Sequence, residues 1–161
     1  TEHHPTKDDL LPLVSSNPFI PPGHEGLILR GLLAGFQSDY VSAAHLLVPQ
    51  FEACIRHFLE SSGIHVTTFE HDGTEKYKLW GGMLDIPVTR KAFGEQYIFE
   101  IEGILLSEAG FNFRNELAHG MLTEAQCISV PAVSAWWLML RLCLQPVAAR
   151  FSGNPDDSIE T

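Results

Sequence analysis

Three residues in one short stretch have side chains suited to chemistry on a phosphate group. Arg114, Asn115 and His119 lie within six residues of one another, between two apolar blocks and just before Gly120. The planar guanidinium of arginine offers a fork of donors that matches phosphate oxygens, and histidine titrates near neutral pH, so it can accept or donate a proton. RNA carries a 2′-hydroxyl beside each phosphate, and these groups suit attack by that internal nucleophile without a metal ion.

Helix geometry separates the arginine from the histidine. Asn115 and His119 are four residues apart and share a helix face, whereas Arg114 and His119 are five apart and diverge by roughly 140°. Within one chain, Arg114 therefore points to a different side of the helix from Asn115 and His119. Asn115 is placed to orient His119 or to hold the substrate. We expect a two-fold symmetric homodimer, because this brings Arg114 of one copy toward His119 of the other.

The run from Arg114 to Gly120, Arg-Asn-x-x-x-His-Gly, resembles the signature of the DUF4209 group of HEPN domains, whose broader hallmark is Arg-x(4–6)-His. The likeness continues in the stretches 46–52 and 80–84 and covers roughly residues 25–150. HEPN domains are small helical bundles that often dimerise. Many are metal-independent endoribonucleases that use this arginine and histidine, and others bind nucleotides or RNA without cutting. The resemblance implies the same fold here, with His119 as general acid or base and Arg114 stabilising charge on the phosphate.

Three further charged residues are candidates to support the motif or to contact its substrate: Glu52, Arg56 and Glu116. Glu52 and Arg56 are four residues apart, and the simpler interpretation is a solvated ion pair that supports its own helix by a few tenths of a kcal/mol. The alternative is that Glu52 contacts the motif. The resemblance around residues 49–52 favours this alternative.

Composition limits the class of protein. The 161 residues are 45% hydrophobic, enough to bury one sizeable core. A net charge of −10 argues against coating of nucleic acid by charge alone, so contact with an RNA partner must be local. The cysteines Cys54, Cys127 and Cys143 form no paired motif, and no histidine spacing typical of a metal site occurs, so we expect no cofactor, no metal and a reducing cytoplasm.

Three parts are expected along the chain. Residues 1–22 contain five prolines and are predicted to form a Pro-rich arm without regular hydrogen bonding, and residues 153–161 a disordered acidic tail. Residues 23–152 are predicted to form the helical domain. The chain begins at Thr1 without methionine, which suggests a piece of a longer protein.

The most apolar segment of the chain, Val130–Leu144, is too short for a membrane span and contains Arg141, so no membrane partner is expected.

Apolar periodicity predicts an all-α bundle with one small β-hairpin. Helical spacing marks residues 25–36, 41–59 and 95–107, and a last helix starts at Pro131 and runs to Val147. Asn112 is a plausible cap for a separate motif helix that ends at Gly120. Asp72-Gly73 predicts the hairpin turn within residues 65–78, and residues 123–129 are predicted as a loop. Of the adjacent Trp136 and Trp137, one should face the core and the other a partner.

Three functions fit these patterns. The first is a dimeric endoribonuclease that leaves a 2′,3′-cyclic phosphate, with its site at the dimer interface. The second is a non-catalytic module of the same fold that binds RNA or a nucleotide. The third is a helical interaction domain of a larger protein, in which the motif is structural. The acidic balance weakens the first most, and the intact set of Arg114, Asn115 and His119 weakens the third.

Overall fold

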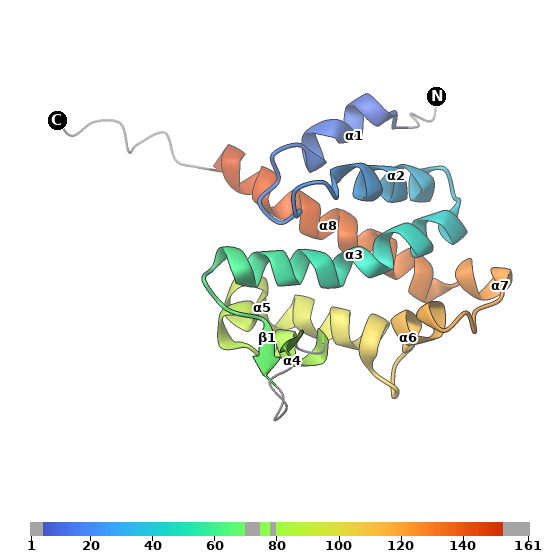
Figure 1. Ribbon diagram of the computed structural model, residues 1–161. Coiled ribbons are helices and arrows are strands. Elements are labelled where there is room, and N and C mark those ends of the chain that lie inside the picture. The colour runs from blue at the N-terminus through green and yellow to red at the C-terminus, as the bar shows by residue number, and fades with distance from the viewer. Residues whose placement is uncertain (1–4, 70–74, 78–79, 153–161) are drawn as a thin grey trace.

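Most of the chain folds into helices stacked in tiers, as the apolar periodicity predicts (Figure 1). The computed structural model describes residues 5–69, 75–77 and 80–152. Its helices are α1 (Lys7–Val14), α2 (Glu25–Phe36), α3 (Tyr40–Ser61), α4 (Trp80–Leu84), α5 (Pro87–Ile101), α6 (Phe113–Ala118), α7 (Glu124–Cys127) and α8 (Val130–Ser152), with a π-helical turn η1 (Glu102–Leu106) after α5. The predicted predominantly helical class is confirmed.

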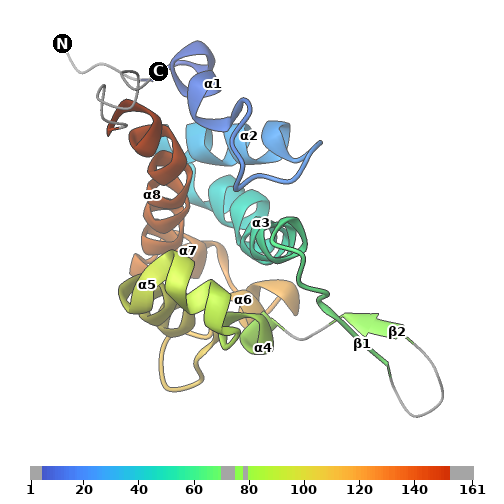
Figure 2. The same ribbon diagram turned by 90° about the vertical axis from the view of Figure 1, so that its left-hand side faces the viewer.

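Helix α3 lies at the centre of the molecule. It packs against α2 on one side and against α4, α5 and α6 on the other, and α8 crosses it (Figures 1 and 2). Leu47, Phe51 and Ile55 recur at helical spacing along α3 and are fully buried. Asp39 begins the helix, because its carboxylate accepts a hydrogen bond from the backbone N–H of Ser42 at 3.0 Å. Helix α3 is therefore the central element against which the surrounding helices pack.

The two adjacent tryptophans of α8 have different surroundings. Trp136 packs against α2, where its indole N–H donates to the carbonyl of Leu32 at 3.0 Å. Its ring lies directly over Gly35, and a Cβ atom added there would come within 2.1 Å of Trp136 Nε1. Trp137, which points about 100° away on the helix, is 50% exposed. One tryptophan thus faces the core and the other solvent.

The last helix is longer than the sequence indicated. The stretch Glu124–Ala148, which spans α7 and most of α8, is long and apolar enough to cross a membrane by length and composition alone, whereas the expectation considered only residues 130–144. Buried helices of soluble proteins pass the same test, and 44% of the apolar window is buried here. Arg141, midway along α8, pairs with Glu100 at 2.6 Å and lies 4.6 Å from the centre of the Tyr97 ring. We interpret α8 as a core helix that also makes polar contacts through Trp136 and Arg141.

The prediction that residues 1–22 lack regular structure is wrong for Lys7–Val14, which form α1. A reciprocal capping box starts this helix: the Thr6 hydroxyl accepts from the backbone of Asp9, and the Asp9 carboxylate accepts from the backbone of Thr6. Only Pro12 lies inside α1, where it removes one backbone donor. The apolar face of α1 packs on α2 and α8, and this tertiary contact outweighs the missing hydrogen bond.

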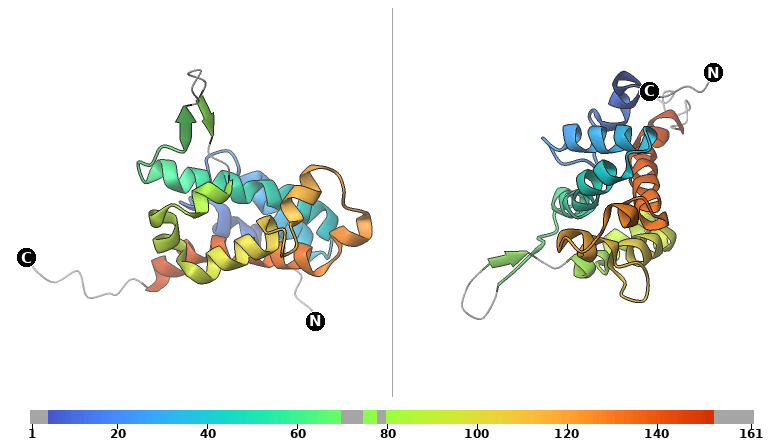
Figure 3. Two further views of the ribbon diagram at one scale, coloured as in Figure 1. Left: turned by 90° about the horizontal axis from the view of Figure 1, so that it is seen from below. Right: turned by 90° about the vertical axis from the view of Figure 1, so that its right-hand side faces the viewer.

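Two short strands project from the bundle (Figures 2 and 3). β1 (Thr67–Phe69) pairs with β2 (Glu75–Tyr77) in antiparallel register, with Thr67 opposite Tyr77. The turn predicted at Asp72-Gly73 lies outside the described residues, as does the predicted tail 153–161.

The segment before the motif differs from its predicted boundaries. α5 starts at Pro87 rather than near residue 95, although Gly94 interrupts it with a φ of 78°. After η1 the chain turns back and passes close to it. There the N–H of Phe111 donates to the carbonyl of Gly103 at 3.1 Å. A Cβ at Gly110 would lie 2.2 Å from that carbonyl oxygen, so this approach to α6 requires glycine.

The predicted loop 123–129 is wrong in part, because it contains the short helix α7. Thr123 and Gln126 form a second capping box, with the Gln126 side-chain oxygen accepting from the backbone of Thr123 at 2.9 Å. The Thr-x-x-Gln pattern was visible in the sequence, but four residues carry too little apolar periodicity to indicate a helix.

We predict that Gly35→Ala lowers the free energy of unfolding by about 1–3 kcal/mol, because the added methyl group displaces the Trp136 ring. Urea unfolding followed by circular dichroism measures the change. Gly26→Ala is the matched control on the same helix, since nothing lies within 4 Å of its added Cβ. It should instead stabilise the protein by up to about 1 kcal/mol. Equal effects of the two substitutions would contradict the packing described here.

Candidate functional site

Helix α6 is short and is fixed at both ends by backbone geometry. Asn112 holds the N-cap position, but with a left-handed φ of 47° and no capping bond from its side chain, so the predicted side-chain cap is wrong. At the other end, Gly120 has a φ of 66° and its N–H donates to the carbonyl of Leu117 at 3.1 Å. The next N–H, of Met121, donates to the carbonyl of Glu116 at 2.9 Å. This pair of bonds is a Schellman motif, and it places glycine where the sequence predicted.

Burial of one residue determines which way the rest of α6 faces. Phe113 is 1% exposed and belongs to the core cluster, and Leu117, one turn later, packs against the same cluster. With that side turned inward, successive residues advance by roughly 100° around the helix. Arg114 therefore lies on one flank, Glu116 on the opposite flank, and Asn115 with His119 on the outer face between them.

A continuous hydrogen-bonded network joins α6 to α3. One oxygen of Glu52 accepts from Arg56 at 2.6 Å, and the other accepts from Arg114 at 3.2 Å. Arg114 also donates to the side-chain oxygen of Asn115 at 2.9 Å. Asn115 in turn donates to the side-chain oxygen of Asn112 at 2.9 Å. The structure thus brings together four of the six predicted site residues and adds Asn112.

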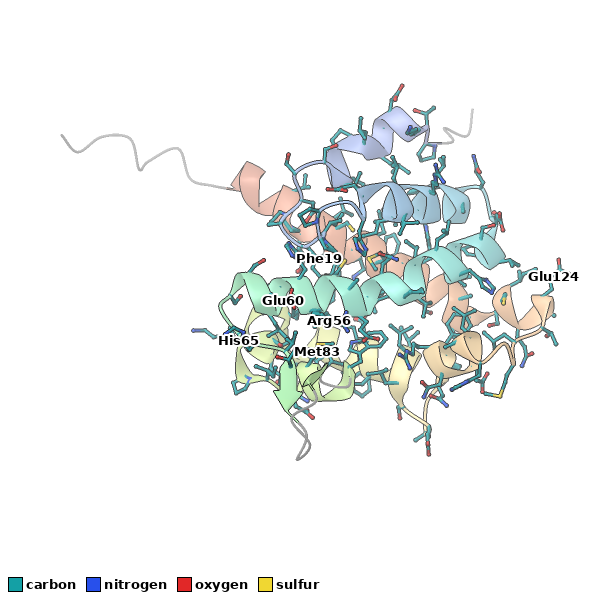
Figure 4. The ribbon with its side chains drawn as sticks, in the orientation of Figure 1. Phe19, Arg56, Glu60, His65, Met83 and Glu124 are labelled. Carbon is teal, nitrogen blue, oxygen red and sulfur yellow. The ribbon has the colours of Figure 1, made fainter. Side chains whose placement is uncertain are left out.

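The network leaves donors of Arg114 available to a ligand. Its side chain is 37% exposed and contacts Glu52 through only one of its terminal nitrogens. A guanidinium carries five N–H donors, and the two bonds described use two of them. Figure 4 shows Arg56 on the side of α3 that faces α4 and α6, with Phe19 on the opposite side. From this side of α3, the carboxylate of Glu52 holds Arg114 in place and also pairs with Arg56.

His119 and Glu116 stand outside this network. His119 is exposed, and among the residues that the structure describes its side chain makes no hydrogen bond or ion pair. Glu116 is half-buried on the opposite flank and likewise lacks a side-chain partner within the described part of the chain. A single copy therefore offers a fixed arginine on one flank of α6 and an exposed histidine on its outer face, with the divergence that the helix spacing predicted.

Asn112 is the site residue whose role the sequence did not indicate. An asparagine just before a helical segment predicts a capping role. Instead its side chain accepts from Asn115 and so fixes the amide that receives Arg114. The three-residue spacing of the two asparagines is a weak signal for this contact, since residues at i and i+3 are neighbours on a helix.

The cysteines offer no nucleophile near this surface. Cys54 and Cys143 are fully buried between α3 and α8, and burial raises the pKa of both thiols, for Cys143 to about 12. Both thiols are therefore protonated at neutral pH and unreactive. No cluster of three or more histidine, cysteine or acidic side chains arranged to hold a metal ion occurs within the described ranges.

Comparison with known proteins finds no relative: no family model matches the chain, and no curated protein or solved structure matches it significantly. The assignment of a function consequently depends on the chemistry of the residues and on the geometry of α6.

We predict a measurable coupling between Glu52 and Arg114 in a double-mutant cycle of Glu52→Gln and Arg114→Gln. The coupling should be between about 0.2 and 1 kcal/mol, because Arg114 is more than a third exposed and water screens the pair. Urea unfolding of the four proteins measures it. A parallel cycle of Glu52→Gln with Arg30→Gln, which alters an exposed arginine on α2, should give no coupling. Equal coupling in both cycles would show that the contact across α3 and α6 carries no energy.

Proposed function

We propose that this chain is a HEPN-like helical domain that binds and cleaves RNA at the outer face of α6, without a metal cofactor. The observation that carries the proposal is that Arg114 is held in place by Glu52 and Asn115 on the surface where His119 is exposed. A phosphate bound by Arg114 would be approached by His119, a group able to move a proton, from a second copy of the chain.

The chemistry follows from these two side chains. His119 removes the proton of a ribose 2′-hydroxyl, whose oxygen forms a bond to the adjacent phosphorus. Arg114 stabilises the charge that develops on the non-bridging oxygens. The bond from phosphorus to the 5′-oxygen then breaks, and that oxygen takes up a proton from solvent water, while His119 returns its proton to the solvent. The products are a 2′,3′-cyclic phosphate and a 5′-hydroxyl, and DNA is not a substrate because it lacks the nucleophile.

A two-fold symmetric homodimer completes the proposed site. Arg114 and His119 of one copy point roughly 140° apart around α6, so a single phosphate is reached more easily by Arg114 of one copy and His119 of the other. The exposed Trp137 on α8 offers apolar surface that a second copy can bury. Because the chain carries a net charge of −10, attraction for RNA has to come from a local contact, and Arg114 supplies it on this face.

A non-catalytic RNA- or nucleotide-binding module is the second candidate. The observation that favours it is the lack of a side-chain partner for His119 among the described residues, because a general base is usually oriented by a hydrogen bond to its other ring nitrogen. In that case Arg114 and Asn115 bind the phosphate and no bond is broken.

We predict that the purified protein cleaves mixed single-stranded RNA in EDTA. Arg114→Ala and His119→Ala should each lower the cleavage rate by roughly 100-fold, because each removes a group that acts in the transition state. Gel electrophoresis of end-labelled RNA measures the rate, and treatment of the products with phosphatase before and after acid identifies a cyclic phosphate.

Arg30→Ala and His45→Ala are matched controls, since both residues are exposed and lie on α2 and α3. They should cleave RNA at the wild-type rate. Loss of cleavage on adding EDTA, or full activity in His119→Ala, would contradict the proposed mechanism. Inactive wild-type protein that still binds RNA through Arg114 would establish the binding module instead.

A further inference from the structure

A surface pocket of about 280 Å³ adjoins the flank of α6 opposite Arg114. Residues from three elements line it, and they include the aromatic rings of Phe111 and Phe113 together with the polar side chains of Glu116 and Gln126. The volume lies below the range of about 300–1,000 Å³ typical of drug-sized ligands. A pocket of this size suits a single flat ring system.

Apolar side chains line most of the pocket, and one of them is exposed to solvent. Both phenylalanines line the pocket, but Phe113 is buried whereas Phe111 is 50% exposed. Phe111 is held by the bond from its backbone N–H to the carbonyl of Gly103. Next to the pocket in the chain, Met121 and Ile128 are also exposed. A hollow lined by apolar side chains together with a few polar groups is typical of a ligand site.

Two polar groups at the pocket have capacity left for a ligand. The carboxylate of Glu116 makes no bond within the described residues. The side-chain oxygen of Gln126 accepts from the backbone N–H and the hydroxyl of Thr123, at 2.9 and 2.8 Å. Because a backbone N–H can only donate, this fixes which atom of the Gln126 amide is the oxygen, and the amide nitrogen remains as a donor. The pocket therefore combines an anionic acceptor with a neutral donor.

We propose that this pocket binds a guanine base of the RNA, stacked on Phe111 and read by Glu116. The inference rests on the proposed function, since it supplies the base specificity of the same site. Guanine is the RNA base with two adjacent N–H donors, on N1 and N2, and these match the two oxygens of a carboxylate as an arginine fork does. Its O6 acceptor lies beside them and suits the free amide nitrogen of Gln126.

The position of the pocket links the base to the proposed cleavage site. An α-helix with its side chains is about 10–12 Å wide. When the base lies on the Glu116 flank, its ribose and phosphate therefore lie over the outer face of α6. That face carries Asn115 and His119 and leads to Arg114. The phosphate attached to the bound guanosine is thus presented to His119 of the same copy, and Arg114 of the second copy completes the site.

Fluorescence anisotropy with 2′-O-methyl hexanucleotides tests the inference, because methylation blocks the nucleophile and leaves only binding. The hexamers UUGUUU and UUUUUU differ in one base. The wild-type protein should bind the guanine-containing hexamer roughly tenfold more tightly. Glu116→Gln should abolish this preference, whereas Glu60→Gln, an exposed carboxylate on α3, should preserve it.

Substitutions of Phe111 distinguish a loss of base stacking from a loss of folding. Phe111→Ala should weaken binding of both hexamers roughly tenfold, and Phe111→Trp, which keeps a ring, should restore it. Phe99→Ala is the control, because Phe99 is 75% exposed and lies on α5. Circular dichroism confirms that each variant is folded. Unlabelled guanosine monophosphate is added as a competitor to distinguish RNA from a free nucleotide.

Equal affinity for the two hexamers, or unchanged binding by Phe111→Ala, overturns the inference even if the protein cleaves RNA. Displacement by guanosine monophosphate as effective as by the unlabelled hexamer overturns the assignment to RNA. A change of mass in light scattering of Phe111→Ala, with binding unaltered, shows that a second copy of the chain covers the pocket and also overturns it. Guanine preference without cleavage supports the pocket and contradicts only the catalytic proposal.

Discussion

A single carboxylate, that of Glu52, joins the central helix to the motif helix. Its two oxygens are divided between Arg56 on the same helix and Arg114 on α6. Arg114 therefore receives only one oxygen of Glu52 and does not form the two-pronged contact that would occupy its guanidinium. This arrangement fixes the direction of Arg114 and leaves part of it open to solvent. The proposed chemistry depends on both properties, because a phosphate needs a donor that is already positioned and still accessible.

The motif helix cannot be stable alone, since six residues are far below the length of about 12–15 at which isolated helices become marginal. Its position derives from the burial of Phe113, from the Schellman motif at Gly120 and from the close passage of Gly110 past Gly103. These constraints also place Phe111 at the pocket. The phosphate-facing flank and the base-facing flank of α6 are consequently set by the same packing.

The sequence predicted the elements whose apolar residues repeat over several turns, and it failed where they do not. α2 and α3 were predicted closely because a long stripe such as Leu47, Phe51 and Ile55 fits only one period. α1 and α7 were missed since their stability comes from capping boxes and tertiary contact. Within the site, helix spacing indicated the divergence of Arg114 from His119. Spacing could not indicate the contact of Arg114 with Glu52, 62 residues away, which only the family resemblance favoured. It also could not indicate a pocket assembled from three elements.

The central claim is that α6 forms an RNA-cleaving site with Arg114 from one copy and His119 from another. Mixing the Arg114→Ala and His119→Ala variants tests it most directly, because a mixed dimer would contain one site with both groups intact and one with neither. With random exchange of subunits, half of the dimers are mixed, so RNA cleavage should recover to roughly one quarter of the wild-type rate. A mixture no more active than the separate variants, under conditions where the wild-type protein cleaves RNA, would contradict the claim.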